Sequence, residues 1–599
     1  MHHVVVHAHC YQPPREDPWL ESVPTELSAA PDHDWNARIN HECYARLADA
    51  EVRQPHAGAL ANDPDAPSGV ARLINLYGWC TFDVGATLCE WMDTEAPDTL
   101  RAMVAGDAAS VRRLGHGNAL AAPYHHVILP LASPRDRRTE VRWGIADFQR
   151  RFGRSPVGMW LPECAVDDDT LDLLAAEGIA FTILAPYQVE TAGETHGLPV
   201  RWRGAAGRTL TILPYDGSLA GEVAFGGLLR DPAALARRLA PTLHDGQSRC
   251  TTLATDGETF GHHHRHGARA LASAMAMIGQ RPDARLTNAA TMVATMPATL
   301  TARLVSPSSW SCAHGVERWR SNCGCRIDHD RPAAQQWRGP LRVALAALAH
   351  DSDTVFEREG AAVFSDNPWS VRDAYGAVVA ADGEALQQFV QRITRTDLDD
   401  AGVQRARELL ELQRATLRLF TSCAWFFDDV ERLEARQVLR YAARVLELSG
   451  LSGRLEPTLV RALSAARATT AGSPSASELF TSAARPHHHA AIDVAAGAMA
   501  MVDAGHPCTR VDVYDVHVAH VAHVATSGAS YVVTLRHRRT GRVLTVIGTV
   551  TGVGPTLRVT VTETGADGGT ARDVAVHDMP ESLSLTLLRP YAMDETLTG

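Results

Sequence analysis

The stretch Gly158-Met159-Trp160-Leu161-Pro162-Glu163-Cys164 has the pattern of a short buried strand that ends at a carboxylate. A parallel strand inside an α/β domain is covered on both faces, so an apolar run leads to a polar residue at its carboxyl end. A second stretch, Ala254-Thr255-Asp256-Gly257-Glu258, repeats this arrangement and ends at Asp256. The alternative interpretation makes each carboxylate a cap of the helix that follows.

Seven strand candidates of this kind precede residue 300, and most are followed by a helical or loop segment. They are residues 4–9, 79–83, 118–122, 157–163, 181–185, 210–215 and 251–256. Strands that alternate with helices predict a parallel sheet, and in barrel enzymes the chemistry lies at the carboxyl ends of the strands. Two strands that each deliver one carboxylate to that rim supply the nucleophile and the general acid/base of glycoside hydrolysis.

Composition and charge exclude several classes of protein. The 599 residues are too many for one core, so several domains are expected. The formal net charge of −12 argues against a nucleic-acid partner held through phosphates. All 57 basic residues are arginine, which excludes enzymes that use a Schiff-base, P-loop or kinase-type lysine.

Cysteine usage and hydropathy predict a cytoplasmic protein without a membrane partner. The 11 cysteines show no disulfide framework, and no Cys/His pair has zinc-finger spacing. The first residues lack the basic and apolar regions of a signal peptide. No apolar stretch approaches the roughly 20 residues that span a bilayer. The histidine runs 262–264 and 487–489 are predicted to be loops and not metal tracts.

The spacing of apolar residues changes twice along the chain. Apolar residues recur at helical spacing in 403–420 and 433–446. Residues 531–537 and 542–548 predict a β-hairpin, and 559–561 and 583–588 continue the strand pattern. These changes predict an α/β barrel over 1–305, an α-helical domain over 306–505 and a β-rich domain over 506–599.

Five stretches, in this order, resemble the five sequence regions of glycoside hydrolase family 57. They are His7-Ala8-His9-Cys10-Tyr11-Gln12, Gly115–Asn118 with His125-His126, Trp160–Glu163, Asp256–His262, and Ser308-Ser309-Trp310 with Trp319. The resemblance is to the subgroup with an additional C-terminal domain of uncharacterised function. It implies a (β/α)7 incomplete TIM-type barrel, a helical domain that closes the active site, and catalysis without a metal or cofactor.

The resemblance also implies a role for each carboxylate. The position that matches Glu163 is the nucleophile of a retaining reaction, and the position that matches Asp256 is the general acid/base. This division requires an ionised Glu163 and a protonated Asp256, whose pKa burial and nearby negative charge should raise. Glu258, two residues further, is the second candidate for the acid.

Further polar and aromatic residues at the rim are candidate contacts to the sugar. They are His7, His9, Gln12, His116, His126, Trp160, Asp216, Glu258, His262, Trp310, Trp319 and Trp425. For Asp216 a structural role in a turn is the alternative, and any one tryptophan is equally well explained as core. Trp425 resembles a residue of the family's helical region, but Cys423-Ala424 stands where the family has Ser-Asp, which puts the polar contact there in question.

These features predict amylase-type cleavage of α-1,4 linkages in an oligo- or polysaccharide α-glucan. One alternative is an α-glucan transferase (4-α-glucanotransferase or branching enzyme), because a sugar hydroxyl can replace water in the second step. A second is a metal-dependent sugar hydrolase or deacetylase, in which His7, His9 and rim aspartates would bind zinc. A third is a non-catalytic glycan-binding protein. Chain-length preference, oligomeric state and the role of the C-terminal domain cannot be read from the sequence.

Overall fold

The computed structural model describes residues 1–53, 70–243, 247–328, 330, 335–467, 472–484, 490–524, 528–563 and 571–591, so the predicted loop at 487–489 lies outside them. The chain divides into two compact units. Unit 1 comprises Met1–Pro14, Thr25–Gly339 and Phe420–Asp428, and unit 2 comprises Arg15–Pro24, Pro340–Leu419 and Asp429–Gly599. Among the helices of the described segments, none has the length and apolar character that a bilayer span requires.

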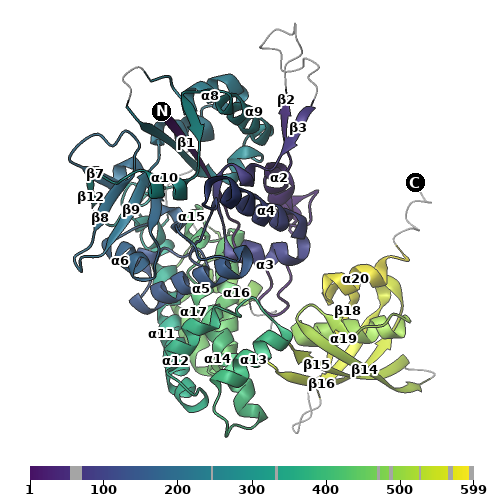
Figure 1. Ribbon diagram of the computed structural model, residues 1–599. Helices are drawn as coiled ribbons and strands as arrows, with labels where there is room; N and C mark the ends of the chain where they lie inside the picture. Colours follow the sequence, from purple (N-terminus) through teal and green to yellow (C-terminus); the bar gives the residue numbers. More distant parts are fainter. Residues whose placement is uncertain are drawn as a thin grey trace. The chain divides into compact units, whose positions relative to one another are not determined.

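Unit 1 is built on two five-stranded sheets (Figure 1). The first has the order β10-β1-β4-β5, with β11 also paired to β1, and every pairing in it is parallel. Its strands are β1 (His2–Cys10), β4 (Thr81–Val84), β5 (Ala119–Leu120), β10 (Arg249–Asp256) and β11 (Ala284–Leu286). The second, β6-β9-β8-β12-β7, consists of β6 (Phe181–Leu184), β9 (Thr209–Pro214), β8 (Val200–Arg203), β12 (Thr301–Leu304) and β7 (Val189–Thr191).

Six of the seven strands predicted before residue 300 are strands in the structure, whereas 157–163 forms only isolated bridges. Met159 bridges Ala121 and Gly158 bridges Phe181, both in parallel orientation. The extended backbone ends at Leu161 because Pro162 has no N–H to donate to a neighbouring strand, and Pro162–Cys164 turns into a short 3-10 helix, η5.

Helices flank these strands, and their ends follow ordinary capping chemistry. They are α1 (Trp35–Ile39), α2 (Ala45–Ala48), α3 (Ala86–Glu95), α4 (Pro97–Leu114), α5 (Pro134–Phe152), α6 (Asp168–Ala176), α7 (Gly217–Ala224), α8 (Pro232–Leu239), α9 (Gly267–Gly279), α10 (Ala289–Thr295) and α15 (Cys423–Phe426). A two-stranded ribbon, β2 (Ala50–Arg53) with β3 (Val70–Ile74), precedes α3. Both α4 and α5 begin with proline and end at a left-handed glycine, Gly115 and Gly153.

Unit 2 begins with a helical region, and its helices at 403–420 and 433–446 confirm the sequence prediction. The helices are α11 (Arg338–Val363), α12 (Pro368–Tyr375), α13 (Gly383–Ile393), α14 (Asp400–Arg418), α16 (Leu433–Ser449), α17 (Ser452–Leu463), α18 (Ala476–Leu479) and α19 (Ala490–Asp503). The two predicted helices are α14 and α16, which pack against each other along their apolar faces.

An antiparallel six-stranded sheet follows, with the order β13-β14-β15-β16-β17-β18 (Figure 1). Its strands are β13 (Arg510–Val511), β14 (Tyr514–Val524), β15 (Gly528–His537), β16 (Val543–Thr551), β17 (Arg558–Glu563) and β18 (Ala571–Ala575). The predicted hairpin is confirmed, since β15 pairs with β16. Helix α19 packs on this sheet, and their apolar side chains form one core.

The strand predicted at 583–588 is wrong, because Glu581–Leu588 forms helix α20. The burial has a helical period: Leu583 and Leu587 are buried, whereas Leu585 between them is 61% exposed. A run of leucines and small polar residues satisfies both periods when it is short, so the sequence pattern alone does not distinguish them.

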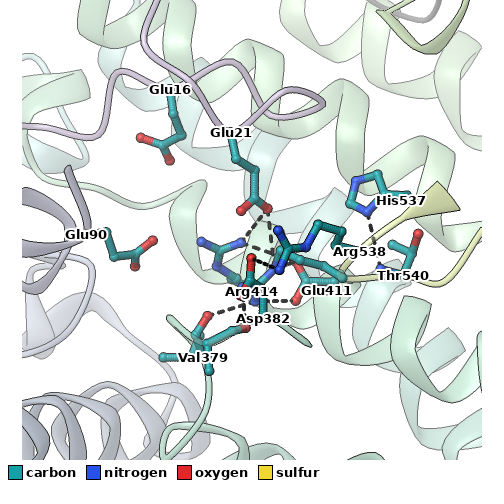
Figure 2. A network of polar contacts seen from close by, with 12 residues as sticks. Glu16, Glu21, Glu90, Val379, Asp382, Glu411, Arg414, His537, Arg538 and Thr540 are labelled. Atoms are coloured by element: carbon teal, nitrogen blue, oxygen red, sulfur yellow. Dashed lines mark hydrogen bonds and ion pairs between the residues drawn. The ribbon is translucent and has the colours of Figure 1, made fainter. Parts of the chain in front are cut away.

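A buried ion-pair network stabilises unit 2 (Figure 2). Arg539, in the turn between β15 and β16, donates to both carboxylate oxygens of Glu411, with Nε 3.0 Å from one and Nη2 2.8 Å from the other. Arg414 lies 2.8 Å from Glu21 and 3.2 Å from Glu411. Burial acts to raise the pKa of Glu411, but the guanidinium groups of Arg539 and Arg414 lower it overall. The network therefore ties α14 to the β15–β16 turn and to the 15–24 segment.

The 11 cysteines are all free thiols, and most are buried. The cytoplasmic location stays a prediction of the sequence.

Candidate active site

Glu163 lies in η5, directly after the bridged segment 158–161, and it is only 8% exposed. Its backbone adopts φ 58° and ψ 21°, in the left-handed region that non-glycine residues rarely occupy. The carboxylate oxygen Oε2 accepts hydrogen bonds from Trp310 Nε1 at 3.0 Å and from Ser311 Oγ at 2.6 Å. The Glu163 carbonyl accepts a further bond from the Trp310 N–H at 2.9 Å. The segment after residue 308 thus fixes both the strained backbone and the carboxylate.

Asp256 is the last residue of β10, and it pairs in register with His9 at the end of β1. Burial, together with the negative charges of Glu258 and Glu163, raises the pKa of Asp256 to about 7, although the nearby His9 acts to lower it. At neutral pH a large fraction of Asp256 therefore carries a proton. Because the charge of Glu163 acts on Asp256, the two carboxylates lie near each other, and their catalytic roles stay a prediction of the sequence.

His7 and His9 of β1 both contact a third carboxylate, Asp83, which lies next to the end of β4. His9 Nδ1 lies 2.9 Å and His7 Nε2 3.2 Å from Asp83 oxygens. Burial alone would lower the pKa of His9, but Asp83 outweighs it and the pKa rises to about 9. The pKa of His7 is lowered, chiefly by burial. His9 is therefore a cation at neutral pH, and it faces Asp256.

His9 is the first member of a chain of hydrogen-bonded side chains. Its Nε2 lies 3.2 Å from His126 Nε2, and His126 Nδ1 lies 2.7 Å from Ser422 Oγ. Burial and the positive charge of His9 hold the pKa of His126 well below its usual range. A protonated His9 thus donates to a neutral His126, which donates from Nδ1 to Ser422. Since both ring N–H groups of His9 are engaged, His9 acts at this site as a fixed charge.

Glu258 lies in the 3-10 turn η8 (Gly257–Phe260), because β10 ends at Asp256. Gln12 Nε2 donates to its carboxylate at 2.8 Å, and the Tyr44 hydroxyl donates at 2.5 Å. Burial raises the pKa of Glu258. Its side chain is held by protein donors, and its charge acts on Asp256. These contacts favour Asp256 over Glu258 as the acid.

The four candidate tryptophans differ in exposure. Trp310 is partly buried and meets Trp160 edge-on, with ring centroids 5.1 Å apart. Trp160 stacks on the His7 ring at 4.4 Å, and Trp425 Nε1 donates to the Arg338 carbonyl. Trp160, Trp319 and Trp425 are fully buried. They present no open ring face in this structure, so exposure supports a sugar platform at Trp310 and a core role for the other three.

Three further candidates lie outside the carboxylate cluster. His116 stands between α4 and the amino end of β5, and its carbonyl accepts from Asn288 Nδ2 at 2.9 Å. Asp216 caps α7 and lies 3.0 Å from Arg238, which matches the structural alternative. His262 Nδ1 lies 2.5 Å from Glu42. Asp216 and His262 thus contact residues other than Glu163 and Asp256, and His116 contributes its backbone carbonyl.

Several residues that shape the site are not among the candidates predicted from the sequence. Asp83 is the last residue of the predicted strand 79–83, so its position carried a signal. Ser311 and Tyr44 carried none, because their contacts to Glu163 and Glu258 depend on the folded chain. Beside Cys423, Ser422 contacts His126 through its hydroxyl at 2.7 Å, and its backbone N–H donates to the His126 carbonyl at 3.0 Å.

An α/β domain in which two carboxylates follow parallel strand segments and act electrostatically on each other has the arrangement that a glycosidase site requires. Residues 16–297 match Glycosyl hydrolase family 57, and residues 334–549 match a domain of unknown function, DUF3536. The chain therefore contains a glycoside hydrolase family 57 domain, which is a domain of glycoside hydrolases and transglycosylases, followed by a C-terminal DUF3536 domain.

Known relatives match parts of the chain. A probable 1,4-alpha-glucan branching enzyme of Mycobacterium tuberculosis is 42% identical over 59 residues, which are 10% of this chain and 10% of that protein. An alpha-amylase of Pyrococcus abyssi is 22% identical over 181 residues, 30% of this chain and 26% of the relative. The matched segments thus span a small part of these relatives.

The fold also resembles a solved structure. An exo-type maltose-forming amylase from Pyrococcus sp. ST04 superimposes with a TM-score of 0.60 at 14% identity, covering 78% of this chain and 83% of that one. At this identity the likeness shows that the two chains share a fold.

Proposed function

We propose that the chain is a retaining enzyme that cleaves α-1,4 linkages of α-glucans as an amylase does, with Glu163 as the nucleophile and Asp256 as the general acid/base. The observation that carries the proposal is the contrast between the two carboxylates. Glu163 accepts two hydrogen bonds from Trp310 and Ser311, as suits an anionic oxygen. Asp256 has a pKa of about 7 and can hold a proton at neutral pH.

In the first step, a carboxylate oxygen of Glu163 attacks the anomeric carbon and forms an ester bond to it. The glycosidic C–O bond breaks at the same carbon, and the leaving oxygen takes the proton of Asp256. The part of the glucan beyond the cleaved bond then leaves with a new hydroxyl. Asp256 is left ionised.

In the second step, Asp256 acts as the base. It removes a proton from water, whose oxygen attacks the anomeric carbon and displaces the Glu163 carboxylate. The product keeps its anomeric configuration because the carbon has been inverted twice. Glu163 recovers its negative charge, which Ser311 and Trp310 stabilise by hydrogen bonding.

The groups around Asp256 set its pKa between the requirements of the two steps. Burial and Glu258 raise the pKa, so that the acid is protonated for the first step, and His9 lowers it, so that the anion is accessible for the second. A base or acid works best when its pKa is near the working pH. His9 keeps its charge because Asp83 raises its pKa to about 9.

We also propose that seven parallel segments form the (β/α)7 barrel of this family. Five are the strands β1, β4, β5, β6 and β9 with their parallel pairings, the sixth is β10, and the seventh is the bridged segment 158–160. The Asp216 N–H donates to the Thr252 carbonyl at 2.7 Å, which supports closure between β9 and β10.

Transfer to a sugar hydroxyl is the second candidate reaction, and the similarity to a branching enzyme favours testing it. Incubation with amylose distinguishes the two. Amylase-type hydrolysis increases the number of reducing ends without creating branch points, and a branching enzyme creates α-1,6 branch points instead. A 4-α-glucanotransferase redistributes chain lengths at a constant number of reducing ends. Glu163→Gln is the inactive control for all three measurements.

A further inference from the structure

Four side chains with metal-binding atoms meet in the segment that follows Ser311. They are Cys312, His314, Cys323 and Cys325, and their ligand atoms all lie within 4.8 Å of one another. Cys312 Sγ lies 3.9 Å from Cys323 Sγ and 3.7 Å from Cys325 Sγ. Cys325 Sγ lies 3.5 Å from His314 Nδ1.

These separations are those of a tetrahedron around a zinc ion. With Zn–S bonds of about 2.3 Å and Zn–N bonds of about 2.0–2.1 Å, tetrahedral angles place two sulfurs about 3.8 Å apart and a sulfur and a nitrogen about 3.5 Å apart. The three measured separations, 3.7, 3.9 and 3.5 Å, agree with these values. A disulfide would account for the proximity of only two of the thiols. It would not explain why the third thiol and the imidazole lie beside them.

We propose that Cys312, His314, Cys323 and Cys325 bind one structural zinc ion. Three thiolates and one imidazole are among the ligand sets of structural zinc sites. Four protein ligands fill the tetrahedron and leave no position for water or substrate, so the ion stabilises the fold and takes no part in the chemistry.

The surroundings of the cluster suit a bound ion of this type. Zinc with three thiolates leaves a net negative charge, and the Arg338 guanidinium interacts electrostatically with Cys323 and Cys325. Arg338 Nη1 also donates to the Cys325 carbonyl at 2.9 Å. Arg318 donates to the carbonyl of Ser311, the residue before Cys312, at 2.9 Å. Arg338 and Arg318 thus place two cations next to the residues of the cluster.

The proposed zinc site directly follows, in sequence, the two residues that donate hydrogen bonds to Glu163. Cys312 follows Ser311, whose hydroxyl lies 2.6 Å from Glu163, and Trp310 donates to the same oxygen. The segment 312–325 has little regular secondary structure beyond the short 3-10 helix η9 (Glu317–Trp319). A zinc ion that cross-links its two ends therefore holds in place the segment that orients Glu163.

This site was not predicted from the sequence, and the zinc site considered as an alternative lay at His7 and His9, which contact Asp83 in the structure. The ligands are spaced as Cys-x-His and Cys-x-Cys, separated by eight residues, and neither pair has zinc-finger spacing.

Metal content of the purified full chain tests the proposal. Protein prepared without chelator and equilibrated with zinc before extensive dialysis is analysed by inductively coupled plasma mass spectrometry. We expect about one zinc per chain in the wild type and in the control Cys508→Ser, and less than about a tenth of that in Cys323→Ser and Cys325→Ser. Cys508 lies in unit 2, outside the cluster. A wild-type chain that retains no zinc, or variants that retain it fully, would overturn the proposal.

A second measurement uses only wild-type protein, in case the variants do not fold. Metal-depleted chain is titrated with Co²⁺, and we expect the intense visible absorption of tetrahedral cobalt with thiolate ligands, saturating at about one equivalent and displaced by zinc. Weak absorption typical of octahedral cobalt would contradict the site. Neither measurement uses a glucan, so both stand whether or not the proposed reaction does.

Discussion

His9 and Asp256 occupy paired positions at the carboxyl ends of two neighbouring parallel strands, β1 and β10. Paired residues of adjacent parallel strands project to the same face of the sheet, so an imidazolium held by Asp83 faces the carboxyl group that must exchange a proton. The pKa of Asp256 reflects opposing contributions: burial and the neighbouring carboxylates Glu258, Glu163 and Asp83 raise it, and His9 lowers it. Removing either the positive charge of His9 or one of the negative charges should therefore shift the pKa of Asp256 in a predictable direction.

Replacing His9 by glutamine removes the cation, so the pKa of Asp256 should rise above about 7. Since the acid must be protonated, the alkaline limb of the kcat/KM profile for maltodextrin should move to higher pH. The exposed His577→Gln serves as the control. An alkaline limb that stays in place, or moves to lower pH, would show that His9 does not set the protonation of the acid.

Replacing Glu258 by glutamine should have the opposite effect. The variant loses the negative charge that, after burial, most raises the pKa of Asp256. The alkaline limb of kcat/KM should therefore move to lower pH, while Gln12 and Tyr44 keep neutral partners. Glu384→Gln, on the exposed face of α13 in unit 2, should leave the profile unchanged. Shifts of the same sign in the His9 and Glu258 variants would contradict the electrostatic account.

The hydroxyl of Ser311 should matter most when Glu163 leaves as a carboxylate in the second step. A hydrogen bond to a charged group contributes about 1.5–3 kcal/mol, so Ser311→Ala should lower kcat by roughly 10–150-fold and let the glycosyl-enzyme accumulate. Ser309→Ala is a matched control, because that hydroxyl bonds the Gly315 carbonyl instead. Equal effects of the two substitutions in rapid-quench kinetics would argue for a merely structural role of Ser311.

The stability of unit 2 should depend on Arg539. Replacing it by methionine leaves the buried Glu411 with one cation fewer, and breaking a buried ion pair costs about 3–5 kcal/mol of unfolding free energy. The adjacent Arg538→Met, which loses a partly exposed pair with Asp382, should cost about 1 kcal/mol or less. Chemical denaturation followed by circular dichroism compares the two. Similar losses for both variants would mean that the network around Arg539 does not hold unit 2 together.

Much of the α/β domain and its two carboxylates could be predicted from the sequence, because buried parallel strands leave an apolar pattern that ends in polar residues. The chain of His9, His126 and Ser422 could not, since its members are 117 and 296 positions apart and no local spacing joins them. The burial of individual tryptophans could not be predicted from the sequence either. Trp160 and Trp310 have the same side chain, but of these two only Trp310 is partly exposed. The convergence of Cys312 with Cys323 likewise depends on the path of a loop.

The most direct test of the proposed chemistry is mass analysis of the chain trapped with a fluorinated maltosyl donor, whose electron-poor sugar forms the ester faster than it is hydrolysed. The account predicts a mass increase of one maltosyl group, mapped by peptide sequencing to Glu163, and no labelling of Glu163→Gln. Label on another residue, or turnover of the donor without any covalent adduct, would contradict it.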